Sequence, residues 1–166
     1  PGMAHTNIIG RRLDREVINL GFSGNALLDM EIAELMASVD DPGLYVLDYV
    51  PNASADAIDQ VGEHFFRIIR DAHPEVPVVF IEDVIFPHTM FDNKILEEVT
   101  KKNVAQKRLF KKLKQSGEKR IYYISAEGMI GDDGEATVDA IHFTDLGAMR
   151  YVDHVLPLIK RALRCH

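Results

Sequence analysis

The chain has 166 residues, 46% of them hydrophobic, which is enough to bury the core of one domain over residues 1–166. Its net charge of −7 argues against general nucleic-acid binding, because phosphate contacts need a basic surface, and favours a small-molecule ligand. Cys165 is the only cysteine, so the sequence holds no internal disulfide and no thiolate zinc site. Without an apolar run that could span a bilayer or form a signal-peptide core, we expect no membrane contact, and the cellular location stays open.

Short apolar runs alternate with longer amphipathic patterns along the chain. In chain order, we expect a helix at 3–12, a strand at 16–20, a helix at 28–39, a strand at 44–50, a helix at 55–73, a strand at 76–82, a helix at 93–115, a strand at 121–125 and a helix at 145–163. Each strand is continuously apolar, as in parallel sheets that are buried on both faces. The sequence therefore predicts an α/β fold, a doubly wound parallel sheet in three layers.

The segments that follow the predicted strands are where a site is expected, because ligands of such sheets bind beyond the carboxyl ends of the strands. Asp139 and His142 lie in the longest of these segments, after the fourth strand. A carboxylate that bonds the imidazole Nδ1 holds a general base in one tautomer and stabilises the imidazolium that forms. An ordinary helix entry, with Thr144 as the N-cap, is the alternative interpretation.

Gly24 and Asn52 follow the first two predicted strands. The backbone N–H of Gly24 and the side-chain amide of Asn52 are the kind of donors that stabilise a developing oxyanion. Each also has a plain structural explanation, a turn for the glycine and a loop or helix N-cap for the asparagine. His88 and Asp92, in the segment after the third predicted strand, are candidates for the substrate pocket.

Residues 101–120 hold about half of the 19 basic residues, a pattern that can mark an anionic partner. Here we favour a solvated helix face, because apolar residues recur on the opposite face at helical spacing, at Leu96, Val99, Phe110 and Leu113.

Residues 131–135 (GDDGE) lack the acidic pattern of a calcium-binding loop and predict a surface turn.

Asp48 lies inside an apolar predicted strand, and its carboxyl needs a hydrogen-bond partner if it is buried. The histidines show no metal-ligand spacing, and no glycine-rich phosphate loop follows a strand.

Three stretches of the sequence resemble blocks II, III and V of the SGNH hydrolases, also called the GDSL esterase/lipase family. In that order, these stretches are NLGFSG, DYVPN and DAIHFTDLG. The resemblance covers nearly the whole chain and implies a flavodoxin-like fold with strand order 2-1-3-4-5. It implies that His142 is the general base, that Asp139 orients it, and that Gly24 and Asn52 form the oxyanion hole, with no cofactor. Block III is degenerate, because the usual Gly-x-Asn-Asp appears here as VPNA. Within the family, the chain looks similar to bacterial acyl hydrolases that often carry an N-terminal β-sandwich domain.

The family's nucleophilic serine, at the end of its first strand, has no counterpart here, because residues 3–12 resemble the helix that follows it. We therefore expect an N-terminally truncated chain that lacks this strand and is inactive alone. An unfilled strand position would leave unpaired backbone groups inside the sheet, so we expect an N-terminal segment, a domain or an oligomer partner to fill it. Ser23 does not fit the Gly-x-Ser-x-Gly spacing, and Ser54 and Ser125 lack an activating neighbour.

The resemblance implies a parent protein that hydrolyses acyl esters, including acetyl esters of carbohydrates, through an acyl-enzyme. The alternative hypothesis is a catalytically inactive, flavodoxin-like module whose pocket binds a ligand without turnover.

Overall fold

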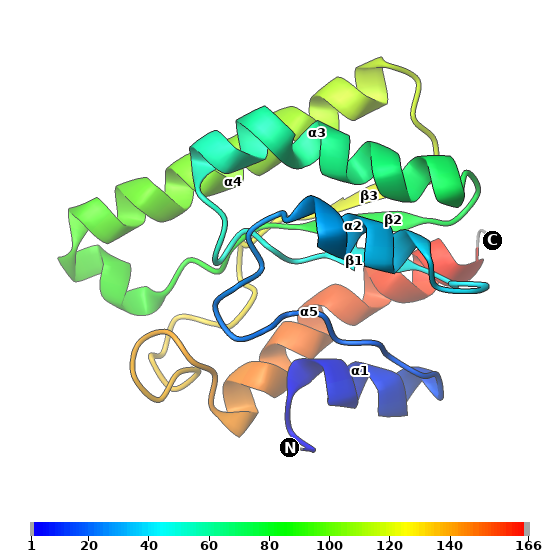
Figure 1. Cartoon of the computed structure of the whole chain (residues 1–166). Helices are drawn as coiled ribbons and strands as arrows, with labels where there is room; N and C mark the ends of the chain where they lie inside the picture. The colour runs from blue at the N-terminus through cyan, green and yellow to red at the C-terminus, as the bar shows by residue number, and fades with distance from the viewer. Residues whose placement is uncertain (1, 165–166) are drawn as a thin grey trace.

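A three-stranded parallel sheet lies between two layers of helices in the computed structural model, which describes residues 2–164 apart from the Met90 side chain (Figure 1). The strands are β1 (Tyr45–Leu47), β2 (Val78–Ile81) and β3 (Ile121–Ile124), in the order β1-β2-β3. The helices are α1 (His5–Leu13), α2 (Met30–Ala37), α3 (Ala55–Ala72), α4 (Asn93–Gln115) and α5 (Asp145–Arg164), with a short 3-10 helix, η1 (Pro87–Phe91). Cys165 lies outside the described residues.

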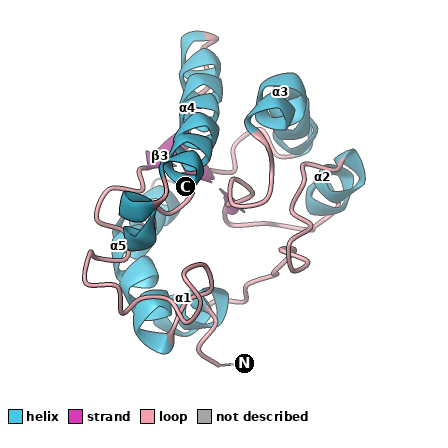
Figure 2. Ribbon diagram, turned by 90° about the vertical axis from the view of Figure 1, so that its left-hand side faces the viewer, coloured by secondary structure: helices cyan, strands magenta, loops and turns pink. Residues whose placement is uncertain are grey.

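Helices α2, α3 and α4 cover one face of the sheet, and α1 and α5 cover the other (Figures 1 and 2). All four residues of β2 are buried, because both helical layers pack on this central strand. This arrangement confirms the predicted α/β fold.

Local sequence signals account for the helix boundaries. The Ser54 hydroxyl accepts the Ala57 N–H over 3.1 Å and so caps α3, whereas Asn52, a candidate cap, lies outside the helix. Helix α4 occupies the range predicted for it and packs Val99, Leu109 and Leu113 inward, with its lysines on the exposed side. Among residues 2–164, no helix is both long and apolar enough to cross a bilayer.

The prediction of a strand at residues 16–20 was wrong. These residues are extended but belong to no sheet ladder in the described chain. Residues 16–20 face β1 across a cavity, so their backbone has no strand beside it to pair with. The apolar composition of this segment is that of a strand, but a sheet ladder also requires a neighbouring strand to pair with.

Buried polar side chains of α4 hold the carboxyl ends of β1 and β2 in place. Asn103 accepts the Asp83 N–H over 2.7 Å and donates to the Asp83 carbonyl over 2.9 Å. Gln106 accepts the Tyr49 hydroxyl over 2.7 Å and is fully buried. These bonds satisfy backbone and side-chain groups that would otherwise be buried without partners.

Candidate active site

Asp139 and His142 are in direct contact on the loop after β3. Oδ2 of Asp139 lies 2.6 Å from Nδ1 of His142, while Oδ1 accepts the backbone N–H groups of His142 (2.7 Å) and Ile141 (3.0 Å). With Nδ1 held in this way, Nε2 is the ring nitrogen left to act as a base. The His142 side chain is 77% exposed, so it is open to a reacting group.

Three hydrogen bonds keep the Asp139 carboxyl ionised. The bond from the His142 side chain, followed by the backbone N–H groups of His142 and Ile141, lowers the pKa of Asp139 to about 2. A carboxylate that stays charged can stabilise an imidazolium beside it.

A narrow turn presents the pair. The N–H of Val138 donates to the carbonyl of His142 over 2.8 Å, and that of Thr144 donates to Ala136 over 2.9 Å. The Thr144 hydroxyl accepts the Gly147 N–H over 3.0 Å and so caps α5. The helix entry and the Asp–His contact therefore belong to one local structure, and the catalytic role of the pair stays a prediction.

Two close contacts fix this turn against α5. A Cβ on Gly147 would lie 1.9 Å from the carbonyl oxygen of Ala136, so only glycine lets the loop approach the helix. Arg150 holds both oxygens of Asp133 at 2.7 and 2.6 Å and also donates to the carbonyl of Ile130. The pairing with Arg150 lowers the pKa of Asp133, which lies in the predicted surface turn.

Gly24 lies in a strained turn. Phe22, Ser23 and Gly24 have φ of 47°, 41° and 81°, three successive residues in a region that favours glycine. The Asn25 side chain donates to the carbonyls of Phe22 (3.0 Å) and Ser23 (3.2 Å) and stabilises the turn. Strain of this kind tends to be kept where a loop has a function.

Asn52 follows β1, is exposed, and its side chain makes no hydrogen bond within residues 2–164. Asn52 lines the same cavity as Ser23 and Asn25, the two neighbours of Gly24. His142 is not among the residues that line this cavity, but the ring of its neighbour Phe143 contacts two residues of the cavity wall, His5 at 6.3 Å and Tyr151 at 5.5 Å between centroids.

His88 and Asp92 lie on the segment after β2. Asp92 accepts the N–H groups of Lys94 (3.0 Å) and Ile95 (3.3 Å) and caps α4, while the His88 ring lies 5.7 Å from that of Phe86. In the described part of the chain, neither residue bonds the Asp139–His142 pair, and their role in a substrate pocket stays a prediction.

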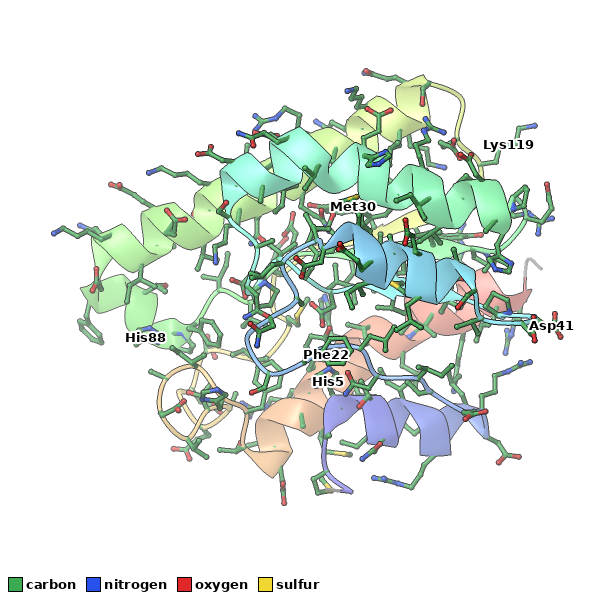
Figure 3. All side chains as sticks on the ribbon, viewed as in Figure 1. His5, Phe22, Met30, Asp41, His88 and Lys119 are labelled. Atoms are coloured by element: carbon green, nitrogen blue, oxygen red, sulfur yellow. The ribbon has the colours of Figure 1, made fainter. Side chains whose placement is uncertain are left out.

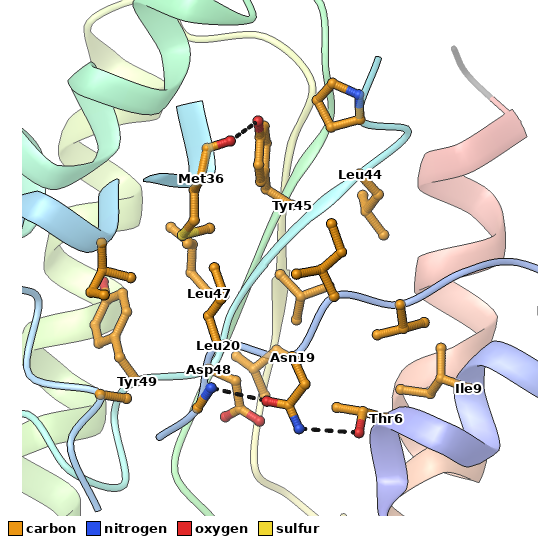
Figure 4. A pocket seen from close by; sticks show the side chains of 18 of the residues that line it. Thr6, Ile9, Asn19, Leu20, Met36, Leu44, Tyr45, Leu47, Asp48 and Tyr49 are labelled. Atoms are coloured by element: carbon orange, nitrogen blue, oxygen red, sulfur yellow. Dashed lines mark hydrogen bonds between the residues drawn. The ribbon is translucent and has the colours of Figure 1, made fainter. Parts of the chain in front are cut away.

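A cavity of about 770 Å³ opens between β1 and residues 16–22, with α1 and α5 on one side and α2 and α3 on the other. We call it the slot (Figure 4). The slot is partly open at the surface of the molecule, so solvent can enter it.

Polar side chains gather at the end of the slot near the carboxyl end of β1. The Tyr151 hydroxyl donates to Asp48 over 2.5 Å, which supplies the partner that the sequence required. Asn19 donates to Thr6 over 3.3 Å and accepts the Gly21 N–H over 2.9 Å, beside Asp48 (Figure 4). Burial raises the pKa of Asp48 to about 7.

Sequence reasoning missed Tyr151, Asn103 and Gln106. Tyr151 looks like an ordinary apolar-face residue of α5, and Asn103 and Gln106 stand within a run of lysines. Asn103 and Gln106 are three positions apart, which places both on the buried face of α4. This spacing is the one sequence signal that could have identified them.

Comparisons with known proteins agree with the parallel α/β fold of the chain. The model of the GDSL-like lipase/acylhydrolase family matches residues 1–160, so the chain belongs to this family. A candidate GDSL-like lipase from Bacteroides ovatus is similar in structure, with a TM-score of 0.94 and 33% identity over 99% of this chain and 48% of that one. Among curated proteins, no sequence matches.

The salicylyl-acyltransferase SsfX3 from a tetracycline biosynthetic pathway shares the fold, with a TM-score of 0.78 and 16% identity over 97% of this chain and 49% of that one. The chain therefore spans about half the length of both structures.

Proposed function

We propose that the chain forms most of the active site of a serine ester hydrolase in which His142 is the general base and Asp139 its orienting carboxylate. The observation that carries this proposal is the 2.6 Å contact between Asp139 Oδ2 and His142 Nδ1 in a member of an acylhydrolase family. Such a pair takes the proton of an attacking hydroxyl and later returns it to the leaving alcohol.

Gly24 and Asn52 are the proposed oxyanion donors. The unbonded Asn52 amide and the strained turn at Gly24 border one cavity, which supports this assignment. Donors fixed before the reaction stabilise the tetrahedral intermediate at no cost in reorganisation.

The nucleophile is proposed to be a serine outside residues 1–166. Within residues 2–164, no serine hydroxyl is hydrogen-bonded to His142. Ser54 caps α3 and Ser23 lies in the strained turn, while the backbone carbonyl of Ser125 accepts a bond from the His154 ring over 2.9 Å. The serine would attack the ester carbonyl, expel the alcohol and leave an acyl-enzyme that water hydrolyses.

The proposed substrates are small acyl esters, acetyl esters of carbohydrates among them. Their hydrolysis needs the nucleophile, the base, the oxyanion donors and a water molecule that takes up the acyl group.

Hydrolysis of p-nitrophenyl acetate tests the proposal. We expect the polypeptide extended by its natural sequence upstream of Pro1 to be active and its His142→Ala variant to lose nearly all activity. The chain of residues 1–166 should be inactive. Equal rates for the extended protein and its variant would remove His142 from the mechanism. An extended protein that binds esters without turnover would favour the ligand-binding module instead.

A further inference from the structure

The turn that carries His142 has an inner and an outer face. Thr137 and Phe143 form an antiparallel bridge, and the Val138 N–H donates to the His142 carbonyl over 2.8 Å. In such a ladder, successive side chains point to opposite faces, and residues opposite each other share a face. Thr137 and Phe143 are half-buried, and Phe143 packs against the core between the sheet and α5. The exposed Val138 side chain is therefore the cross-strand neighbour of the His142 ring on the outer face.

Large apolar side chains stand on both sides of the Asp139–His142 pair along the chain. Val138 is 71% exposed and Ile141 is 60% exposed, and in the described residues only Phe91 exceeds them among the large apolar side chains. A single exposed apolar side chain needs no explanation, but two beside a candidate base form a surface that a bound molecule can cover. We call Val138, Ile141 and the His142 ring the outer patch.

The segment after β2 adds a further exposed apolar side chain at this end of the molecule. Phe86, in that segment, and Phe143 pack against the same hydrophobic cluster. Figure 3 shows His88 at the end of the molecule where the loop of residues 126–144 also lies. His88 belongs to η1, which carries the exposed Phe91 (87%). The outer patch is therefore not isolated in a polar surface.

The loop around the outer patch is strongly acidic. Residues 126–145 contain six acidic side chains and no lysine or arginine. Arg150 of α5 pairs with one of them, Asp133, and three hydrogen bonds keep Asp139 ionised. The field of such a loop disfavours an anionic ligand and leaves apolar contact as the attraction open to an uncharged one.

Proton transfer decides which part of an ester would meet the outer patch. When the tetrahedral intermediate collapses, the bond from the carbonyl carbon to the alcohol oxygen breaks, and the acyl group stays on the nucleophile. The leaving oxygen takes its proton from Nε2 of His142, so it must lie within hydrogen-bond reach of that nitrogen. The side chain beside the ring, Val138, would then contact the alcohol rather than the acyl group.

We infer that the outer patch binds the alcohol part of the ester and selects uncharged alcohols with an apolar face, such as an aryl ring or the C–H face of a sugar. The inference rests on the proposed function, because it takes His142 as the group that protonates the leaving oxygen. Val138 is the principal specificity residue, and Ile141 extends the apolar surface beside it.

Two acetyl esters of different alcohols test the inference in the extended polypeptide. 2-Naphthyl acetate and vinyl acetate leave the same acetyl-enzyme, so a variant that affects them differently acts on a step that still involves the alcohol. Val138→Ser should lower kcat/KM for 2-naphthyl acetate by about three- to tenfold, through lost apolar contact, and that for vinyl acetate by less than about twofold. Equal losses for the two esters would overturn the inference.

Control variants and a longer acyl chain separate this subsite from other effects. Val138→Leu stays apolar and should keep the preference for 2-naphthyl acetate. Val104→Ser, at an exposed valine of α4 (52%), should change neither rate. If Val138→Ser harms p-nitrophenyl butyrate more than p-nitrophenyl acetate, the patch contacts the acyl chain, and the inference is wrong.

A sulfonate on the naphthyl ring tests the charge selection. The sulfonated ester should have a lower kcat/KM than 2-naphthyl acetate at low ionic strength, and added salt should recover part of the loss, because the acidic loop repels it through solvent. A sulfonated ester that reacts as fast as the uncharged one would overturn the selection for uncharged alcohols.

Binding of the product 2-naphthol tests the patch without turnover. In the chain of residues 1–166, 2-naphthol should shift the methyl NMR signals of Val138 and Ile141 and leave those of Val104 in place. An extended protein that hydrolyses no ester, while these shifts occur, would count against the proposed function alone. An active extended protein whose preference between the two acetates is unchanged by Val138→Ser would count against this inference alone.

Discussion

The Tyr151 hydroxyl donates to Asp48 over 2.5 Å and ties α5 to the carboxyl end of β1. Burial is the main reason that the pKa of Asp48 rises to about 7, and the charge of Asp83 raises it further while the Tyr151 bond opposes the rise. In an unfolded chain the same carboxyl titrates near its ordinary value of about 3.9. At a pH between these two pKa values, the Asp48 carboxyl therefore binds a proton when the chain folds.

This proton uptake predicts a pH-dependent stability. The stabilising contribution of Asp48 is complete below about pH 4 and is lost as the pH rises through about 7, at about 1.4 kcal/mol per pKa unit. Asp48→Asn keeps the acceptor for Tyr151 and should become more stable than the parent chain at about pH 8, with little difference at about pH 4. Urea unfolding across this range measures the gap, with Asp71→Asn, an exposed carboxyl of α3, as the control. A gap that does not change with pH would contradict the raised pKa.

Gly147→Ala should destabilise the chain and displace the Asp139–His142 turn. The added Cβ would lie 1.9 Å from the carbonyl oxygen of Ala136, which is backbone and cannot rotate away. Overpacking of this kind costs about 1–3 kcal/mol. Gly43→Ala is the control, since its Cβ would meet ordinary contacts at 3.6 Å or more. Equal unfolding midpoints for the two variants would show that the loop moves freely.

Asp139→Asn should lower the kcat of the extended polypeptide by about 10³–10⁴. The amide can donate to Nδ1 and so favours the wrong imidazole tautomer, although the shape of the side chain is kept. Asp132→Asn changes an exposed carboxylate of the same loop and should leave the rate nearly unchanged. If both variants lose the same activity, the effect is one of loop charge rather than of base orientation.

Asn103→Ala should lower stability by about 2–3 kcal/mol. The variant leaves the N–H and C=O of Asp83 buried without their partners, and an unsatisfied buried group costs about 1–3 kcal/mol. Gln115→Ala, at the exposed end of α4, is the matched control and should change stability little. Urea unfolding compares the two, and equal stabilities would show that water replaces the lost bonds.

Local patterns predicted the features that depend on local contacts. Helix α4 was predicted with its observed boundaries because a cap, an apolar stripe and a polar face all lie within one stretch. The Asp139–His142 contact was foreseeable for the same reason, since the two residues are three apart.

Features that depend on distant contacts could not be predicted. Asp48 was expected to need a partner, but Tyr151 lies 103 positions away and carries no sign of that role in its own sequence context. Residues 16–20 have the composition of a strand and still form no ladder within the described chain, because pairing is decided by what lies beside them. Composition determines which segments can be strands, and neighbours determine which of them pair.

Labelling with a fluorophosphonate, which reacts with activated serines, tests the central claim most directly. In the extended polypeptide, mass spectrometry should find the label on one serine upstream of Pro1, and His142→Ala should abolish it. The same experiment with Asp132→Asn should leave the labelling intact. A label on Ser23, Ser54 or Ser125, or labelling that survives the loss of His142, would contradict the assignment of His142 as the base for a serine delivered from outside residues 1–166.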